Sequence, residues 1–135
     1  EKFARLPTSV ISFAEGTRLT PAKQQTSPYR HLLKPKAGAL ALTLGAMGGQ
    51  FHAMLDVTIV YPAGEPNFWD FLCGRVPGIV VRVRQLPIPP QFSTGDYVQD
   101  RAFRRAFHQW LEAIWEFKDQ EIAVLLGHAQ EAARA

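Results

Sequence analysis

The chain has 135 residues, of which 47% are hydrophobic, and this length and composition suit one folded domain with its own core. Fifteen Lys and Arg against twelve Asp and Glu give a net charge of +3, which favours anions mildly and argues against a nucleic-acid-binding protein. No apolar run reaches the roughly 18 to 20 residues of a membrane span, so the sequence predicts a piece that is soluble or at most lies on a surface. The single cysteine excludes an internal disulfide.

The first predicted element is a buried strand over residues 8–14, where β-branched and apolar residues lead into Phe13. This run ends at the sequence Glu-Gly-Thr-Arg, residues 15–18. Residues 20–29, which include two prolines and two glutamines, have the composition of a surface loop. Residues 37–47 are rich in Ala and Leu and predict a helix that ends at the glycines 48 and 49.

Two more strands are predicted over residues 54–62 and 78–88, one central and the other near an edge of the sheet. In the second, Val81 and Val83 alternate with arginines, which is typical of a half-exposed strand. Between the two strands, residues 67–73 predict a short helix capped by Asn67. Residues 86–96 indicate an extended linker closed by a turn.

The strongest helical signal covers residues 100–126, where apolar residues recur at spacings of three and four. These residues are Phe103, Phe107, Trp110, Leu111, Ile114 and Phe117. The stripe is expected to pack against the sheet. Near the start of this helix, Arg101, Arg104 and Arg105 form either a solvated basic face or a contact for anions.

The alternation of strands with helical stretches predicts an α/β layer structure with a mostly parallel sheet at its core. All 135 residues are expected to form one domain. In this prediction residues 1–95 supply the sheet and the binding loops, and residues 96–128 supply a long C-terminal helix.

Residues 15–18 have the chemistry of an anion site. Gly16 lets the backbone approach a ligand closely, Thr17 offers a hydroxyl, and Arg18 presents a planar fork that matches a phosphate. Glu15 would orient Arg18 or accept a ligand hydroxyl. The alternative is an ordinary local ion pair between Glu15 and Arg18.

A second basic element lies just before the helix predicted over residues 37–47. Lys34 and Lys36 flank Pro35 there, so their ammonium groups and the free N–H groups of the helix start could share one anion. The two elements together predict a phosphate cradle.

Several segments resemble the glycerolipid acyltransferases. The segment FAEGTR resembles their Phe-Pro-Glu-Gly-Thr-Arg block, with Ala14 in place of the proline. The segments YRHLLKPKAGAL and LDVTIVYP resemble later blocks of the same family, in the same order. The residues LCG around Cys73 and the last helix are most similar to the branch of lysophosphatidic acid and lysocardiolipin acyltransferases. The resemblance covers nearly the whole chain.

This resemblance implies the C-terminal part of a glycerol-3-phosphate acyltransferase-like fold. The implied activity is transfer of a fatty acyl group from acyl-CoA or acyl carrier protein to a lysophospholipid such as 1-acylglycerol-3-phosphate, in phospholipid biosynthesis. In the family, the Glu-Gly-Thr-Arg block binds the phosphate and glycerol of the acceptor. That role would fall here to Glu15, Gly16, Thr17 and Arg18.

The downstream basic position of the family matches Lys36. Lys34 remains an alternative, because Pro35 and Ala37 depart from the commoner Lys-Lys-Gly spelling.

The catalytic dyad of the family, a His and an Asp separated by four residues, is expected upstream of residues 15–18. The pair His52 and Asp56 is rejected because only three residues separate them and they lie downstream. His31 precedes the basic loop and could touch a ligand, but a packed or solvent-facing role fits a lone histidine better. The chain is therefore expected to be the C-terminal part of a membrane-associated enzyme at the cytoplasmic face, and to be inactive alone.

No metal or cofactor site is predicted, since one cysteine and four scattered histidines give no ligand spacing. The expected partners are the lysophospholipid acceptor, the acyl thioester donor, a membrane reached through an N-terminal part, and a second copy of the chain. Nucleic acid is not expected, because the aromatic residues lie on an apolar stripe. The alternative function is a non-catalytic module that binds anionic lipids through the basic loops and the three arginines of residues 101–105.

Overall fold

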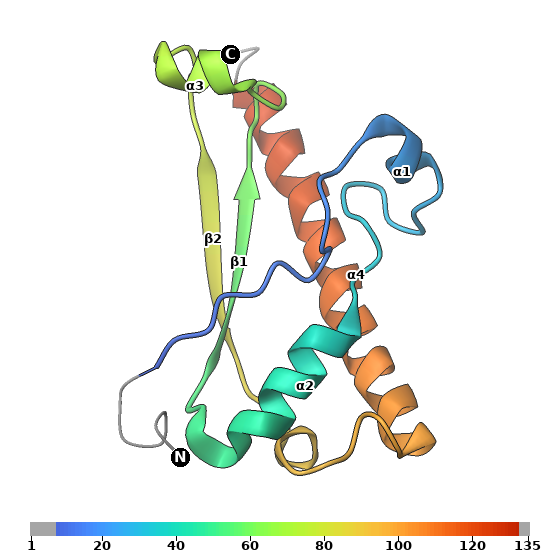
Figure 1. Cartoon of the computed structure of the whole chain (residues 1–135). Coiled ribbons are helices and arrows are strands. Elements are labelled where there is room, and N and C mark those ends of the chain that lie inside the picture. Colours follow the sequence, from blue (N-terminus) through green and yellow to red (C-terminus); the bar gives the residue numbers. More distant parts are fainter. Residues whose placement is uncertain (1–7, 133–135) are drawn as a thin grey trace.

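The computed structural model describes residues 8–132, which form one β-hairpin and a set of helices (Figure 1). The elements in chain order are α1 (Pro21–Gln25), α2 (Ala37–Met47), the 3₁₀ turn η2 (Gly48–Gln50), β1 (Met54–Val60), α3 (Phe68–Leu72), β2 (Val80–Leu86), the 3₁₀ turn η3 (Pro90–Ser93) and α4 (Arg101–Ala132).

The sheet has two antiparallel strands, so the predicted mostly parallel sheet is wrong. Its register runs from Met54 opposite Leu86 to Val60 opposite Val80. Residues 61–79 between the strands are long enough for a parallel crossover, but they hold only the five-residue helix α3, and none of them packs against the core as a crossover over the sheet would. The segment between the strands therefore closes a hairpin.

The strand predicted for residues 8–14 is also wrong. These residues have no strand partner in the described chain, and the side chains of Ile11 and Phe13 are 83% and 86% exposed. An apolar run becomes a buried strand only where a neighbouring strand and a covering layer exist, and the hairpin provides neither here.

The long helix α4 lies along the hairpin and α2 and supplies more buried core residues than any other element (Figure 1). Phe107, Leu111, Trp115 and Ile122 are buried at helical spacing. The predicted stripe is thus confirmed in its first half, but Phe117 is 51% exposed and Trp115 takes the inner position instead. A stripe read at spacings of three and four drifts around a helix of this length, which is why its far end was misplaced.

The local predictions for shorter elements hold in part. The bounds of α2 agree with the prediction, and Asn67 caps α3 through a hydrogen bond from the Asp70 N–H to its Oδ1 atom, 2.9 Å. The predicted loop over residues 20–29 and the predicted linker over residues 86–96 each contain a short helix. Thr20 caps α1 inside the predicted loop, and η3 buries Phe92 inside the predicted linker.

The two faces of the hairpin differ sharply. Asp56, Thr58 and Val60 of β1 are buried on the side of the hairpin that α4 covers, whereas the alternate residues of both strands are bare. The bare side chains are Leu55, Val57, Ile59, Val81 and Val83, each at least 46% exposed. The alternation predicted for β2 is present: Val81 and Val83 lie on the uncovered face, and Arg84 is turned towards α4.

Candidate functional site

The Glu-Gly-Thr-Arg sequence forms a tight turn. The Gly16 N–H donates to the Phe13 carbonyl oxygen at 2.9 Å, and Gly16 has a φ of 64°. That left-handed conformation favours glycine. The turn is tied to the start of α2, because the Lys36 N–H donates to the Ala14 carbonyl oxygen at 2.7 Å. Two segments that the sequence analysis paired are therefore neighbours in the fold.

Lys36 lies directly over Gly16. A Cβ atom built on Gly16 would be 3.1 Å from the Lys36 Cδ atom and 3.4 Å from its Nζ atom. The backbone before Lys36 is fixed by packing, since Leu33 and Pro35 are buried and the Trp115 Nε1–H donates to the Leu33 carbonyl oxygen at 3.0 Å. The structure thus brings Lys36 to the glycine turn, as the family position implied.

Lys34 points elsewhere. Its Nζ atom is 3.6 Å from the Glu112 Oε1 atom on α4, in an exposed ion pair. Of the two lysines that sequence left as alternatives, Lys36 is the one placed at residues 15–18, and the shared cradle of Lys34 and Lys36 is not formed.

A further cation at the turn comes from α1. The Lys23 Nζ atom donates to the Thr17 Oγ1 atom at 2.6 Å, and Lys23 lies in the first turn after the Thr20 cap. The sequence analysis missed Lys23. The signal that could have indicated Lys23 is Thr20 followed by Pro21, which is typical of a helix start and places Lys23 in the first turn of that helix.

Arg18 is exposed beside this pair. Among residues 8–132, neither Arg18, Lys23 nor Lys36 forms an ion pair with a carboxylate. The predicted local ion pair between Glu15 and Arg18 is therefore not observed. Lys23 and Lys36 thus reach this turn from two other segments, Arg18 lies two residues after its glycine, and none of the three cations is paired with a carboxylate within residues 8–132.

Glu15 lies on the inner side of the turn and is half-buried. Burial raises the pKa of its carboxyl above the ordinary value, while a hydrogen bond from the Leu33 backbone and the charge of Lys118 partly oppose that rise. Glu15 therefore faces the hydrophobic interior and the α4 lysine.

A buried charge network lies beneath the turn. The Asp56 carboxylate accepts from Lys118 Nζ and from Arg84 Nη2, both at 2.6 Å, and Lys118 also donates to the Val57 carbonyl oxygen at 2.9 Å. Arg84 stacks on the Phe117 ring, with its Cζ atom 4.0 Å from the ring centre. Burial raises the pKa of Asp56, but the hydrogen bonds from Lys118 and Arg84 outweigh it and lower the pKa below the ordinary value.

This network occupies Asp56, so its carboxylate is bound to two cations and His52 lies exposed outside it. His52 and Asp56, the pair rejected on sequence spacing, are thus not arranged as a catalytic dyad. His31 is tied through its backbone, because its N–H donates to Asp119 Oδ1 at 2.7 Å. This bond anchors the loop before Lys36 to α4.

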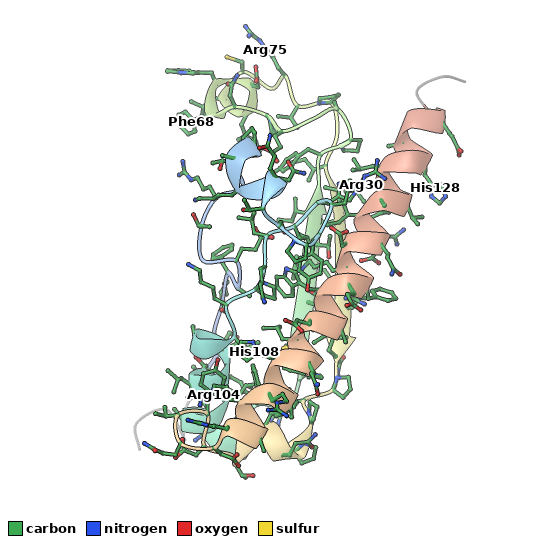
Figure 2. The ribbon with its side chains drawn as sticks, turned by 90° about the vertical axis from the view of Figure 1, so that its right-hand side faces the viewer. Arg30, Phe68, Arg75, Arg104, His108 and His128 are labelled. Carbon is green, nitrogen blue, oxygen red and sulfur yellow. The ribbon has the colours of Figure 1, made fainter. Side chains whose placement is uncertain are left out.

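The three arginines of residues 101–105 are remote from the turn. Figure 2 shows Arg104 at one end of α4 and Arg30 and α3 towards the other end of the molecule. Arg104 also donates to the Val98 carbonyl oxygen at 3.3 Å, which closes the start of α4. The two basic groups that sequence analysis combined in a lipid-binding module are therefore separate surfaces.

Comparisons of the chain with family models, with curated proteins and with solved structures find no significant match. No helix within residues 8–132 is both long enough and apolar enough to cross a membrane. In the same part of the chain, no group of three His, Cys, Asp or Glu side chains is arranged to hold a metal ion.

Proposed function

We propose that this chain supplies the acceptor-phosphate site of a glycerolipid acyltransferase. The observation that carries the proposal is that Lys23 and Lys36 both contact the turn that holds Gly16 and Arg18, and that none of these three cations has a carboxylate partner among the described residues. A phosphate monoester would provide the missing negative charge. The bidentate fork of Arg18 and the ammonium groups of the two lysines would bind its oxygens.

The expected affinity is modest. Each charge-assisted hydrogen bond contributes about 1.5 to 3 kcal/mol, and the loss of translational and rotational freedom costs about 4 kcal/mol or more. Four such bonds of about 2 kcal/mol each, two from the Arg18 fork and one from each lysine, leave about 4 kcal/mol. Binding of glycerol 3-phosphate alone is expected at a Kd of about 1 mM, and an acyl chain or a bilayer would have to add the rest.

The transfer step itself needs a general base. In the proposed reaction, a histidine takes the proton of the acceptor hydroxyl, the oxygen attacks the carbonyl carbon of the thioester, and the thiol leaves as the acyl ester forms. The 135 residues contain no His and Asp separated by four residues. The proposal therefore assigns acceptor binding to this chain and the proton transfer to residues outside it.

A titration of the ¹⁵N-labelled 135-residue chain with glycerol 3-phosphate, observed by NMR, tests this function. The amide signals of Gly16, Thr17 and Lys36 are expected to shift together, with glycerol at the same concentration producing no shift. If the largest shifts instead arise at Arg101, Arg104 and Arg105, or if glycerol gives the same shifts, the proposal is wrong.

A further inference from the structure

The hairpin carries an unusual apolar tip at α3. Phe68, Trp69, Phe71 and Leu72 are between 58% and 71% exposed, and none of the five residues of α3 is buried. The core and the side chains packed against it include no residue from 61 to 79 in the described chain. These aromatic side chains therefore add nothing to the core that the structure shows.

The four side chains share one side of the helix. At about 100° per residue, Phe71, Phe68, Leu72 and Trp69 follow one another on an arc of about 160°, and Asp70 lies opposite its middle. The Asp70 carboxylate is occupied by the helix cap, where it accepts the Asn67 N–H at 3.2 Å. The tip is amphipathic although it is a single turn and a half.

The backbone of the tip is closed on itself. A capping box satisfies its start, and Gly74, with a φ of 65°, ends it. The Gly74 N–H donates to the Phe71 carbonyl oxygen and the Arg75 N–H to that of Asp70, at 3.2 and 2.8 Å. These two bonds form a Schellman motif. Polar backbone groups satisfied within the segment are what an apolar medium requires.

The position of α3 suits a planar partner. Figure 1 places α1 and α3 at the same end of the molecule, and Figure 2 shows both on the side opposite α4. Lys23 of α1 has no carboxylate partner among residues 8–132, and Arg75 is exposed directly after α3. Of the two acidic residues in the same segment, Asp70 is taken up by the helix cap and Glu65 is exposed. The apolar tip, with Arg75 after it and Lys23 at the same end, suits a layer of apolar chains beneath anionic head groups.

We infer that α3 inserts into the interfacial layer of an anionic bilayer. The choice of a lipid partner rests on the proposed function, because a lysophospholipid acceptor resides in such a layer. Phe68, Phe71 and Leu72 enter the acyl layer, Trp69 lies at the boundary between acyl chains and head groups, and Arg75 contacts lipid phosphates. This contact places the α1 end of the chain, with the glycine turn behind it, against the membrane surface.

Sedimentation with vesicles tests this inference. The 135-residue chain is expected to bind vesicles of mixed phosphatidylcholine and phosphatidylglycerol. The double variant Phe68→Ser, Phe71→Ser is expected to bind at least about tenfold more weakly. The matched control is Leu42→Ser, Val98→Ser, which also removes two exposed apolar side chains, on α2 and just before α4. The control is expected to bind like the unmodified chain, and circular dichroism should show all three folded.

A second readout identifies the inserted residue. Lipids with brominated acyl chains should quench tryptophan emission in the unmodified chain, and Trp69→Phe should remove that quenching while Trp110 and Trp115 remain. Equal vesicle binding by the α3 variant, or no binding by the unmodified chain, would overturn the inference. So would a lipid-free dimer that the α3 variant turns into a monomer, because α3 would then contact protein.

The two proposals can fail separately. Glycerol 3-phosphate carries no acyl chain, so the α3 variant should bind it as the unmodified chain does. Vesicle binding through α3 without any binding of glycerol 3-phosphate would reject the acceptor site and retain the insertion. The reverse pattern would reject the insertion and retain the site.

Discussion

The side chain of Lys36 occupies the space that a side chain on Gly16 would need. The Lys36 Nζ atom lies 3.4 Å from the position of a Cβ on Gly16, and the Lys36 N–H is bound to Ala14 in the same turn. The glycine is thus required twice, once for its positive φ and once for the approach of the lysine. This pair joins the two basic segments into one candidate site.

Gly16→Ala is expected to destabilise the fold by about 1 to 2 kcal/mol, because an L-residue is strained at a φ of 64°. The new methyl group would also displace Lys36 and weaken binding of glycerol 3-phosphate. Urea unfolding measures the first effect. Gly78→Ala is the control, since its Cβ would meet nothing within 4 Å, and equal stability of the two variants would contradict the predicted strain.

Lys118→Met is expected to cost about 3 kcal/mol or more, because it leaves the buried Asp56 carboxylate with only Arg84 as a cation partner. Lys34→Met removes an exposed ion pair and is expected to cost less than about 1 kcal/mol. Urea unfolding of both variants gives the comparison. Similar losses for the two would show that the Asp56 network is not a buried one in solution.

Stability should fall in acid because of Asp56. Its pKa in the folded chain is lowered from the value of 3.8, so the stabilisation is complete above about pH 4 to 5 and is lost as the pH falls through the folded pKa. Asp56→Asn is expected to be less stable at neutral pH and to lose less on acidification. Urea midpoints at pH 5 and pH 3 measure this, and an unchanged acid dependence in the variant would refute the assignment.

Ionisation of Glu15 should change the stability of the fold in the opposite direction to that of Asp56. Its pKa is raised from 4.5, so its ionised form costs stability once the pH rises above the folded pKa. Glu15→Gln retains an acceptor for the Leu33 N–H and is expected to equal or exceed the unmodified chain in stability at pH 7. Thermal unfolding at pH 4 and pH 7 tests the sign. A variant that is markedly less stable at pH 7 than at pH 4, relative to the unmodified chain, would contradict it.

Short-range patterns predicted the local structure well. Asn67 and Asp70 form their capping box within four residues, and the Ala-rich run that forms α2 has the predicted bounds. Such signals act through neighbouring backbone groups and need no tertiary partner. The prediction of a parallel sheet failed because strand direction depends on how the chain returns between strands, and residues 61–79 turn back at the end of the hairpin instead of packing across the sheet.

The sequence predicted that the candidate site is an anion site, but it did not predict all of the residues that form it. Residues 15–18 and Lys36 are brought together as expected, yet the sequence left Lys34 open as an alternative to Lys36. Two tertiary contacts separate the lysines: Pro35 between them is buried, and Lys34 pairs with Glu112 on α4. Glu112 is distant from Lys34 in sequence, so this pairing could not be predicted from the local pattern. Lys23 was missed for the same reason, since its contact with Thr17 depends on the path of the loop into α1.

The central claim is that Arg18 and Lys36 bind a phosphate monoester and that Lys34 does not. Titration calorimetry with glycerol 3-phosphate compares Arg18→Gln and Lys36→Gln with Lys34→Gln, which removes the same charge from an exposed pair. Each of the first two variants is expected to weaken binding about tenfold, and the third to change it less than twofold. Equal affinity in all three variants, or a loss confined to Lys34→Gln, would contradict the account.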